Sequence, residues 1–234
     1  MIEWQDDKDV FGRMFALTGD PIFKNLRNAV DHFDADLSDA LSWGQLKSKK
    51  WLVEELEKVC ESKISPTLGK VFICAGWYGL LANMLFEGKF NINIIRSFDI
   101  DENCAPIADS LNKSKVIDGW KFKAITKDIL KLNYYEALYH TKRSDGSEVE
   151  LIDAPDTIIN TSCEHIKEFE RWYRKLPKDK LVILQSNNYF GLPEHNNCVK
   201  DLEEFKEQCP MNTILYSGVF ELKAYNRFML IGII

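Results

Sequence analysis

The sequence has no long hydrophobic run, no closely spaced cysteine pair and no excess of basic residues. No apolar stretch reaches the roughly 18 residues that span a bilayer, and the first residues are acidic and lack an apolar core. We therefore expect neither a membrane span nor a secretory signal. The six cysteines are scattered without a CxxC pair, several of them in apolar runs where a free thiol behaves as a small hydrophobe. A cytoplasmic protein with reduced thiols is expected.

The charge balance argues against a dedicated nucleic-acid binder. The formal net charge is −6, whereas such proteins usually carry a basic face. Hydrophobic residues make up 45% of the chain and charged residues 28%, the ordinary balance of a globular protein. With 234 residues, the chain has the length of one α/β domain plus a modest extension.

The character of the chain changes near residues 62–69, where Ser, Pro and Gly precede a sharp apolar run. Upstream, apolar residues in 51–59 recur at three- and four-residue spacing, which predicts a helix with Ser48 as its N-cap. We interpret residues 1–68 as a helical extension packed on a main domain of residues 69–234. The segment 43–49, which combines an aromatic, amides and two bases, is a candidate lid over a site; a solvated helix start explains it equally well.

Strand-like and helix-like segments alternate after residue 69. Strands are predicted at 70–75, 92–100, 122–126, 156–162 and 180–186, and helices at 80–86, 105–111, 166–175 and 198–208. The last two strand-like segments, 213–222 and 227–234, are joined by about four residues, which suits an antiparallel pair. We predict an α/β fold with a doubly wound, mostly parallel seven-stranded sheet, a C-terminal antiparallel hairpin and the N-terminal helical extension.

In such a sheet, ligands bind beyond the carboxyl ends of the strands. The first strand runs into the loop Ala75-Gly76-Trp77-Tyr78-Gly79, at the end of the segment 72–79. A glycine there lets the backbone approach a ligand, and the following helix N-terminus offers unpaired N–H groups. The loop is not GxGxxG, so by itself it is equally consistent with a tight turn.

Two carboxylates strengthen the prediction of a nucleoside site. Asp99 ends the second strand about twenty residues beyond the glycines, where an acid can accept hydrogen bonds from both ribose hydroxyls of an adenosine. Asp101 suits a helix cap better. Asp128 follows the third strand, within reach of an adenine amino group.

Together these features resemble the class I S-adenosylmethionine-dependent methyltransferases over roughly residues 69–234. The resemblance implies S-adenosylmethionine as cofactor: the loop backbone at Ala75–Gly79 would meet the methionine moiety, Asp99 the ribose and Asp128 the adenine, with Ile100 and Asn160 as further contacts. The sequence departs from the family in two places. Cys74 replaces the acid usually found before the glycines, and Tyr78 occupies the usual second glycine, where it would crowd the methionine. A nicotinamide dehydrogenase shares the loop and the ribose acid, but the closing hairpin favours the methyltransferase type.

The catalytic face is expected after the fourth and fifth strands. The fourth ends in Asn160-Thr161-Ser162-Cys163-Glu164-His165, without the Asp/Asn-Pro-Pro-aromatic motif of enzymes that methylate exocyclic amines of DNA bases. The fifth is followed by many amide, hydroxyl and imidazole groups, for which turn chemistry is the alternative. The residues expected to line a polar substrate pocket are Glu164, His165, Gln185, Asn187 and His195.

We expect no bound metal, although Cys163, His165, His195 and Cys198 are weighed as a zinc site and Cys163 as a nucleophile beside His165. The predicted function is methyl transfer from S-adenosylmethionine to a small polar or amino-acid-like acceptor, in preference to nucleic acid. Two alternatives remain open. The chain could transfer the aminocarboxypropyl group, as nicotianamine-synthase-like relatives do, or it could be a non-catalytic binding module that keeps the fold.

Overall fold

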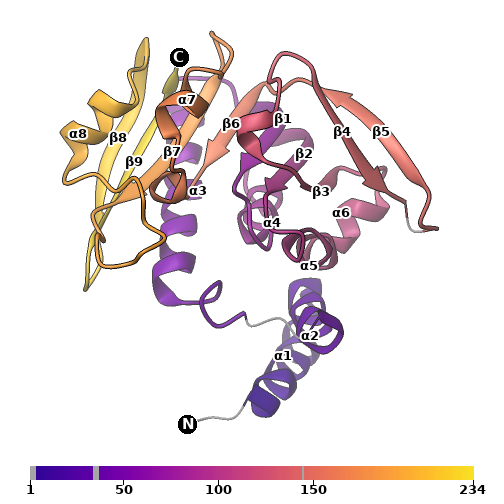
Figure 1. Cartoon of the computed structure of the whole chain (residues 1–234). Coiled ribbons are helices and arrows are strands. Elements are labelled where there is room, and N and C mark those ends of the chain that lie inside the picture. The colour runs from indigo at the N-terminus through magenta and orange to yellow at the C-terminus, as the bar shows by residue number, and fades with distance from the viewer. Residues whose placement is uncertain (1–3, 34–36, 144) are drawn as a thin grey trace.

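The computed structural model describes residues 4–33, 37–143 and 145–234. Seven strands form one sheet in the order β3-β2-β1-β6-β7-β9-β8, in which β9 runs antiparallel to both of its neighbours and all other pairs are parallel (Figure 1). Their bounds are β1 Thr67–Cys74, β2 Asn91–Asp99, β3 Phe122–Thr126, β6 Thr157–Asn160, β7 Leu181–Asn187, β8 Thr213–Glu221 and β9 Asn226–Ile233. The predicted fold class, including the terminal hairpin, is confirmed.

Alternation along the buried strands divides the core between the two faces of the sheet. On one face, Phe72 and Phe98 pack with residues of α7 (Phe169–Tyr173) and α8 (Leu202–Gln208). On the other face, Val71 and Ile73 pack with α3 (Trp43–Ser62), α4 (Leu80–Glu87) and α5 (Cys104–Leu111). The strands are hydrophobic on both sides because both faces are covered, which is typical of parallel sheets.

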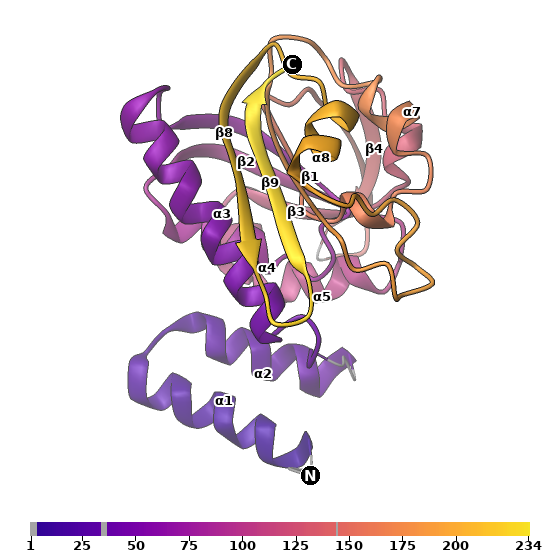
Figure 2. The ribbon, with the colours of Figure 1, turned by 90° about the vertical axis from the view of Figure 1, so that its left-hand side faces the viewer.

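Helix α3 begins earlier than the sequence predicts. Its N-cap is Ser42, whose hydroxyl accepts a hydrogen bond from the N–H of Gln45, whereas Ser48 lies buried in the second turn. The helix runs beside β8 and β9 (Figure 2), and Trp51 stacks on Phe220 with ring centroids 5.4 Å apart. This helix is therefore part of the core layer of the main sheet.

The first two helices, α1 (Trp4–Thr18) and α2 (Pro21–Phe33), form a pair below the sheet in Figures 1 and 2. Leu26 and Val30 of α2 pack against Ile107 and Leu111 of α5. The predicted helical extension thus comprises this pair and α3, and its residues 1–3 and 34–36 lie outside the described part of the chain. Among the described residues, none of the helices combines the length and the apolarity that crossing a bilayer requires.

A hairpin that the sequence did not predict replaces a helix in the crossover from β3 to β6. The segment after Asp128 forms η1 (Ile129–Lys131), β4 (Ala137–Lys142) and β5 (Glu148–Asp153), and α6 (Lys113–Ile117) precedes β3. The Tyr139 hydroxyl donates to Asp153, which also pairs with Arg96 of β2 at 3.3 Å. This buried network anchors the hairpin to the sheet, beside η2 (Cys163–His165) and α7 on the same side of the fold.

Candidate functional site

The loop after β1 has an unusual backbone. Ala75, Trp77 and Gly79 all have positive φ, at 54°, 49° and 73°, and two of them carry a side chain. Residues other than glycine rarely adopt this left-handed region, and such strain is concentrated at functional sites. Gly76 is required for a different reason, because a Cβ there would lie 2.0 Å from Oγ of Ser97. The loop therefore folds tightly against the end of β2.

The strained position is occupied by Trp77 and not by Tyr78, which the sequence placed at the family's second glycine. Tyr78 packs with the helices of the N-terminal pair, while its ring stacks on Trp77 at 4.9 Å between centroids. Of these two aromatic residues, Trp77 lines the cavity described below. Tyr78 does not line this cavity, so the structure gives no support to the expectation that it crowds the methionine position.

Asp99 ends β2 directly beside this loop. Its Oδ2 accepts a hydrogen bond from the N–H of Trp77 at 2.9 Å, and its Oδ1 accepts one from the N–H of Asp101 at 3.1 Å. An ionised carboxylate has about four acceptor positions, so two stay available. The two backbone donors fix the carboxylate where it lines the cavity.

A cavity of about 350 Å³ lies at the carboxyl ends of β1, β2 and β6. This is within the usual size range of small-molecule sites, and it is at the point where the strand order reverses, between β1 and β6. Ile73 and Leu81 contribute apolar surface to its lining, and seven of the other lining residues carry polar or charged side chains. These other lining residues are Asp39, Gln45, Lys49, Ala75, Gly76, Trp77, Asp99, Ile100, Thr161, Ser162, His165 and Ile166.

The N-terminal segment supplies one wall of the cavity through Asp39, Gln45 and Lys49. Lys49 is only 8% exposed, and its Nζ donates to Oε1 of Gln45 at 2.6 Å. Burial, with the nearby Arg227 guanidinium, lowers the pKa of Lys49 to about 7. A lysine with such a pKa is able to accept a proton near neutrality.

The sequence did not single out Asp39, Gln45 or Lys49 as site residues, although Gln45 and Lys49 belong to the segment 43–49 that was a candidate lid. Gln45 and Lys49 continue the line of Leu52, Leu56 and Val59 along one face of α3, at spacings of three and four residues. Polar residues on the buried face of an amphipathic helix are the signal that would have identified them.

Four predicted cofactor contacts lie at this edge of the sheet but do not line the cavity. They are Tyr78, Gly79, Asp128 and Asn160. Asp128 accepts a hydrogen bond from the N–H of Leu130 at 2.9 Å and caps η1. Asn160 is fully buried, and its Oδ1 accepts from the N–H of Ser162 at 2.8 Å. These contacts hold the loops that frame the cavity.

Glu164 and Asn187, two of the predicted catalytic residues, belong to a buried cluster next to the cavity. Asn187 Nδ2 donates to Glu164 Oε1 at 2.7 Å, and Arg227 of β9 lies 3.4 Å from the same oxygen. Arg227 also donates to the carbonyl of Thr161. The terminal hairpin therefore positions the loop after β6 through a charged group in the interior.

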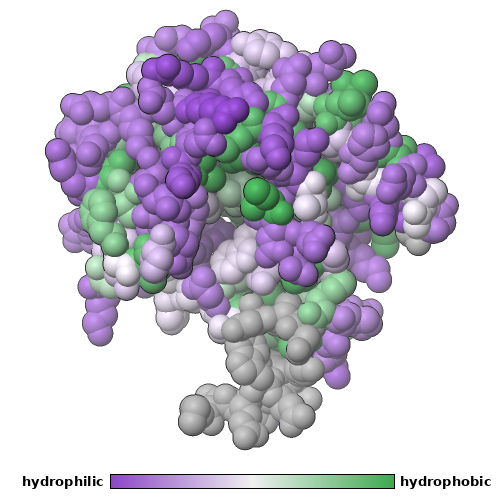
Figure 3. All heavy atoms as spheres, viewed as in Figure 1, coloured by the Kyte–Doolittle hydropathy of each residue, from purple (hydrophilic) through white to green (hydrophobic). Residues whose placement is uncertain are grey.

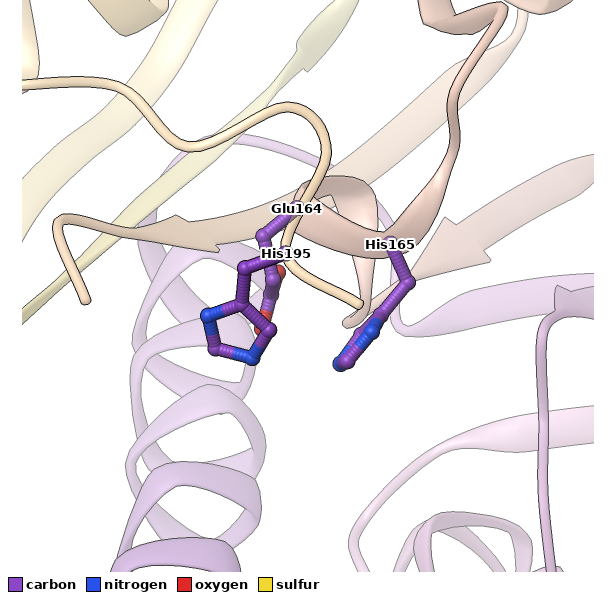
Figure 4. A group of neighbouring side chains, drawn as sticks. All are labelled: Glu164, His165 and His195. Atoms are coloured by element: carbon purple, nitrogen blue, oxygen red, sulfur yellow. The ribbon is translucent and has the colours of Figure 1, made fainter. Parts of the chain in front are cut away.

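The structure also brings His165 and His195 together (Figure 4). Their ring centroids are 4.6 Å apart in an edge-to-face arrangement, and His165 lines the cavity. Glu164, His165 and His195 each offer one metal-ligating atom, and these atoms lie within 4.8 Å of one another. In this donor set the carboxylate of Glu164 stands in place of the thiols of Cys163 and Cys198, which were considered from the sequence as zinc ligands.

Gln185 is not brought into the cavity. It is fully buried; its Oε1 accepts from the hydroxyl of Ser48 at 2.9 Å, and its Nε2 donates to the carbonyl of Ser48 at 3.2 Å. From the sequence, Gln185 was expected to line the substrate pocket because it is an amide at the end of an apolar strand. The structure instead places it as a link between β7 and α3.

Cys163 is a poor nucleophile in this fold. The residue is fully buried, which raises the pKa of its thiol well above the usual value, and Sγ points at the carbonyl of Asn160, 3.6 Å away. A thiol is a nucleophile only as the thiolate. The alternative of a Cys163–His165 pair is therefore contradicted.

The topology defines a doubly wound α/β protein with a cavity at the switch point of its sheet. No protein-family model and no curated protein sequence matches the chain. Among solved structures, magnesium protoporphyrin IX methyltransferase (ChlM) of Synechocystis PCC 6803, with bound S-adenosylmethionine, is similar with a TM-score of 0.54 and 15% identity, covering 97% of this chain and 96% of that one. The chain has the fold of the class I S-adenosylmethionine-dependent methyltransferases.

Two further solved structures share this fold. The N-methyltransferase NodS of Bradyrhizobium japonicum WM9, in complex with S-adenosyl-L-homocysteine, has a TM-score of 0.55 and 9% identity, covering 88% of this chain and 98% of that one. The small RNA methyltransferase HEN1 has a TM-score of 0.54 and 16% identity, covering 78% of this chain and 25% of that one.

Proposed function

We propose that the chain binds S-adenosylmethionine in the cavity between β1, β2 and α3 and transfers its methyl group to a small polar or amino-acid-like acceptor. The observation that carries the proposal is the placement of Asp99 against the left-handed loop, with both lining one cavity. A carboxylate in this place suits two ribose hydroxyls. The solved structures of ChlM and NodS, which contain S-adenosylmethionine or S-adenosylhomocysteine, support the choice of cofactor.

In this proposal Asp99 and Ile100 would hold the adenosine, and Gly76, Thr161 and His165 would hold the methionine end. S-adenosylmethionine supplies an electrophilic methyl group when bound. An acceptor held in the cavity would take up that methyl group as its bond to sulfur breaks, and would lose a proton. Alignment of the acceptor by the walls of the cavity supplies much of the rate.

We propose that one of two side chains receives the proton. His165 and Lys49 lie on the walls contributed by η2 and α3, and the pKa of Lys49 near 7 suits general-base catalysis. We propose that Asp128 and Asn160 contribute to cofactor binding indirectly. Asp128 caps η1, and Asn160 holds the loop after β6.

The proposal of a small acceptor rests on the polar lining of the cavity and on the acidic balance of the chain. On the face shown in Figure 3, hydrophobic residues form small separate areas among hydrophilic ones. The acceptors named for the similar structures range from a porphyrin to small RNA, so they do not narrow the choice. All six thiols are unpaired in the structure, which suits the reducing cytoplasm that we propose as its compartment.

Calorimetry of the full chain with S-adenosylhomocysteine tests the cofactor site, and we expect one site per chain. Incubation with S-adenosylmethionine and a pool of amino acids and small amines should yield S-adenosylhomocysteine and a methylated small molecule. Methylthioadenosine as product would instead select aminocarboxypropyl transfer. Absence of binding heat would overturn the cofactor assignment, and methylation of RNA or DNA alone would overturn the acceptor class.

A further inference from the structure

We propose that Glu164, His165 and His195 form a binding site for a divalent transition-metal ion beside the cofactor cavity. The three side chains come from η2 and from the loop after β7, and they point to the same side (Figure 4). One donor atom of each lies within 4.8 Å of the others. Ligand atoms about 2 Å from a common ion have separations below this limit.

Glu164 provides independent evidence that a cation belongs here. The residue is 2% exposed, and its Oε1 is occupied by Asn187 and Arg227. Its Oε2 is buried and has no hydrogen-bond partner among the residues that the structure describes. Leaving a buried carboxylate oxygen without a partner costs free energy, which a bound cation would offset.

The second histidine is held in the tautomer that a metal needs. Nδ1 of His195 lies 2.7 Å from the carbonyl oxygen of Tyr189, and because a carbonyl only accepts, Nδ1 carries the proton. The lone pair of a neutral ring is then on Nε2. Metal-ligating histidines are commonly oriented in this way, by a carbonyl on the other ring nitrogen.

The donor set indicates the class of ion. Two imidazoles and one carboxylate suit Zn²⁺, Co²⁺ or Mn²⁺, whereas Mg²⁺ and Ca²⁺ prefer oxygen ligands alone. Three protein ligands would leave coordination positions open, and the site borders the cavity that His165 lines. A water molecule or an oxygen atom of the acceptor would complete the coordination.

The charged groups around Glu164 limit the affinity. Arg227 shares its carboxylate at 3.4 Å, and Lys49 interacts electrostatically with both Glu164 and Arg227. Two positive side chains next to a dication weaken its binding. We therefore expect weaker binding than in a closed structural zinc site, and removal of either histidine should abolish most of it.

Titration of the full chain with Co²⁺ tests the site through the visible absorption of the bound ion. We expect one ion per chain, with an affinity at least tenfold lower for His195→Ala. The matched control is His140→Ala, because His140 is exposed on the β4–β5 hairpin and also faces a carboxylate, Glu150, at 3.3 Å. The control should bind Co²⁺ as the unaltered chain does.

His195 does not line the cofactor cavity, so His195→Ala should bind S-adenosylhomocysteine normally, which also shows that the variant is folded. Should Glu164→Gln unfold the chain by removing the charge that faces Arg227, the histidine variant still tests the metal site. No Co²⁺ absorption, or equal affinity in His195→Ala and the unaltered chain, would overturn the metal site. Metal binding without S-adenosylhomocysteine binding would overturn the proposed function and leave the metal site intact.

Discussion

The N–H of Trp77 donates to Oδ2 of Asp99 at 2.9 Å, which joins the loop after β1 to the end of β2. The two residues are 22 positions apart in sequence and lie on the wall of the same cavity. The bond sets the direction of the carboxylate while leaving acceptor positions for a ligand. Any nucleoside held there is therefore positioned by both segments.

Asp99→Asn should weaken binding of S-adenosylhomocysteine by about tenfold or more. The amide oxygen can accept from the N–H of Trp77 or from that of Asp101 but not from both. The variant also loses the charge-assisted hydrogen bonds to ribose, which are worth about 1.5–3 kcal/mol. Asp101→Asn is the control, because Asp101 is exposed and its Oδ1 accepts from the N–H of Asn103, a bond that the amide oxygen preserves. Calorimetry measures both affinities. Equal affinities for the two variants would exclude Asp99 as the ribose ligand.

Ala75→Gly should stabilise the protein. Ala75 has φ of 54°, a conformation that costs a residue with a Cβ about 1–2 kcal/mol and costs glycine little. We expect a net gain of up to about 1 kcal/mol, because glycine loses more entropy on folding. Ala82→Gly, inside α4, should instead destabilise the protein by about 1 kcal/mol. Urea denaturation compares the two, and destabilisation of similar size in both would show that Ala75 is not strained.

Lys49→Met should change how stability depends on pH. The pKa of Lys49 is about 7 in the folded protein and 10.5 as the reference for an exposed lysine, so the unfolded chain binds more protons between these values. The free energy of unfolding of the unaltered chain therefore falls as pH decreases from 10.5 toward 7. Below pH 7 the whole loss of stability that comes from burying Lys49 is present. Each pH unit between the two pKa values corresponds to about 1.4 kcal/mol.

The variant lacks this dependence, so its stability advantage should be largest below pH 7 and vanish above pH 10.5. The groups that face Lys49 are Arg227, Asp39 and Glu164, and burial is the main cause of the shift. Lys50→Met is the control, since Lys50 is exposed and lies 3.6 Å from Glu54. Chemical denaturation across this range gives the answer. Parallel stability curves for Lys49→Met and the unaltered chain would contradict the shifted pKa.

Ser48→Ala should destabilise the protein by about 1–3 kcal/mol, because it leaves the buried Oε1 of Gln185 without a partner. Ser62→Ala at the exposed end of the same helix removes only a local bond to the carbonyl of Lys58 and should have little effect. A double-mutant cycle of Ser48→Ala with Gln185→Met measures the coupling between helix and strand. A coupling energy near zero would show that the pair contributes nothing to docking α3.

Local patterns in the sequence predicted most of the sheet. The strand at 122–126 agrees with β3 (Phe122–Thr126), and the terminal pair agrees with β8 and β9 to within a residue. The hairpin β4–β5 escaped prediction because half of the residues in its strands are exposed, so the strands lack the continuous apolar runs of the buried parallel strands. Its buried residues Tyr139 and Asp153 accept hydrogen bonds from Arg96, which is 43 and 57 residues away from them in sequence. Local sequence does not indicate that these three residues meet.

The sequence by itself determined the class of fold and the position of Asp99, because apolar periodicity and the order of strands are local properties. The tertiary structure alone decided which polar groups meet. It placed Trp77 in the strained position, turned Gln185 toward α3, and brought Lys49 to the cavity and His195 to His165. Those pairings join residues from different elements, so they depend on packing across the sheet, which no local pattern encodes.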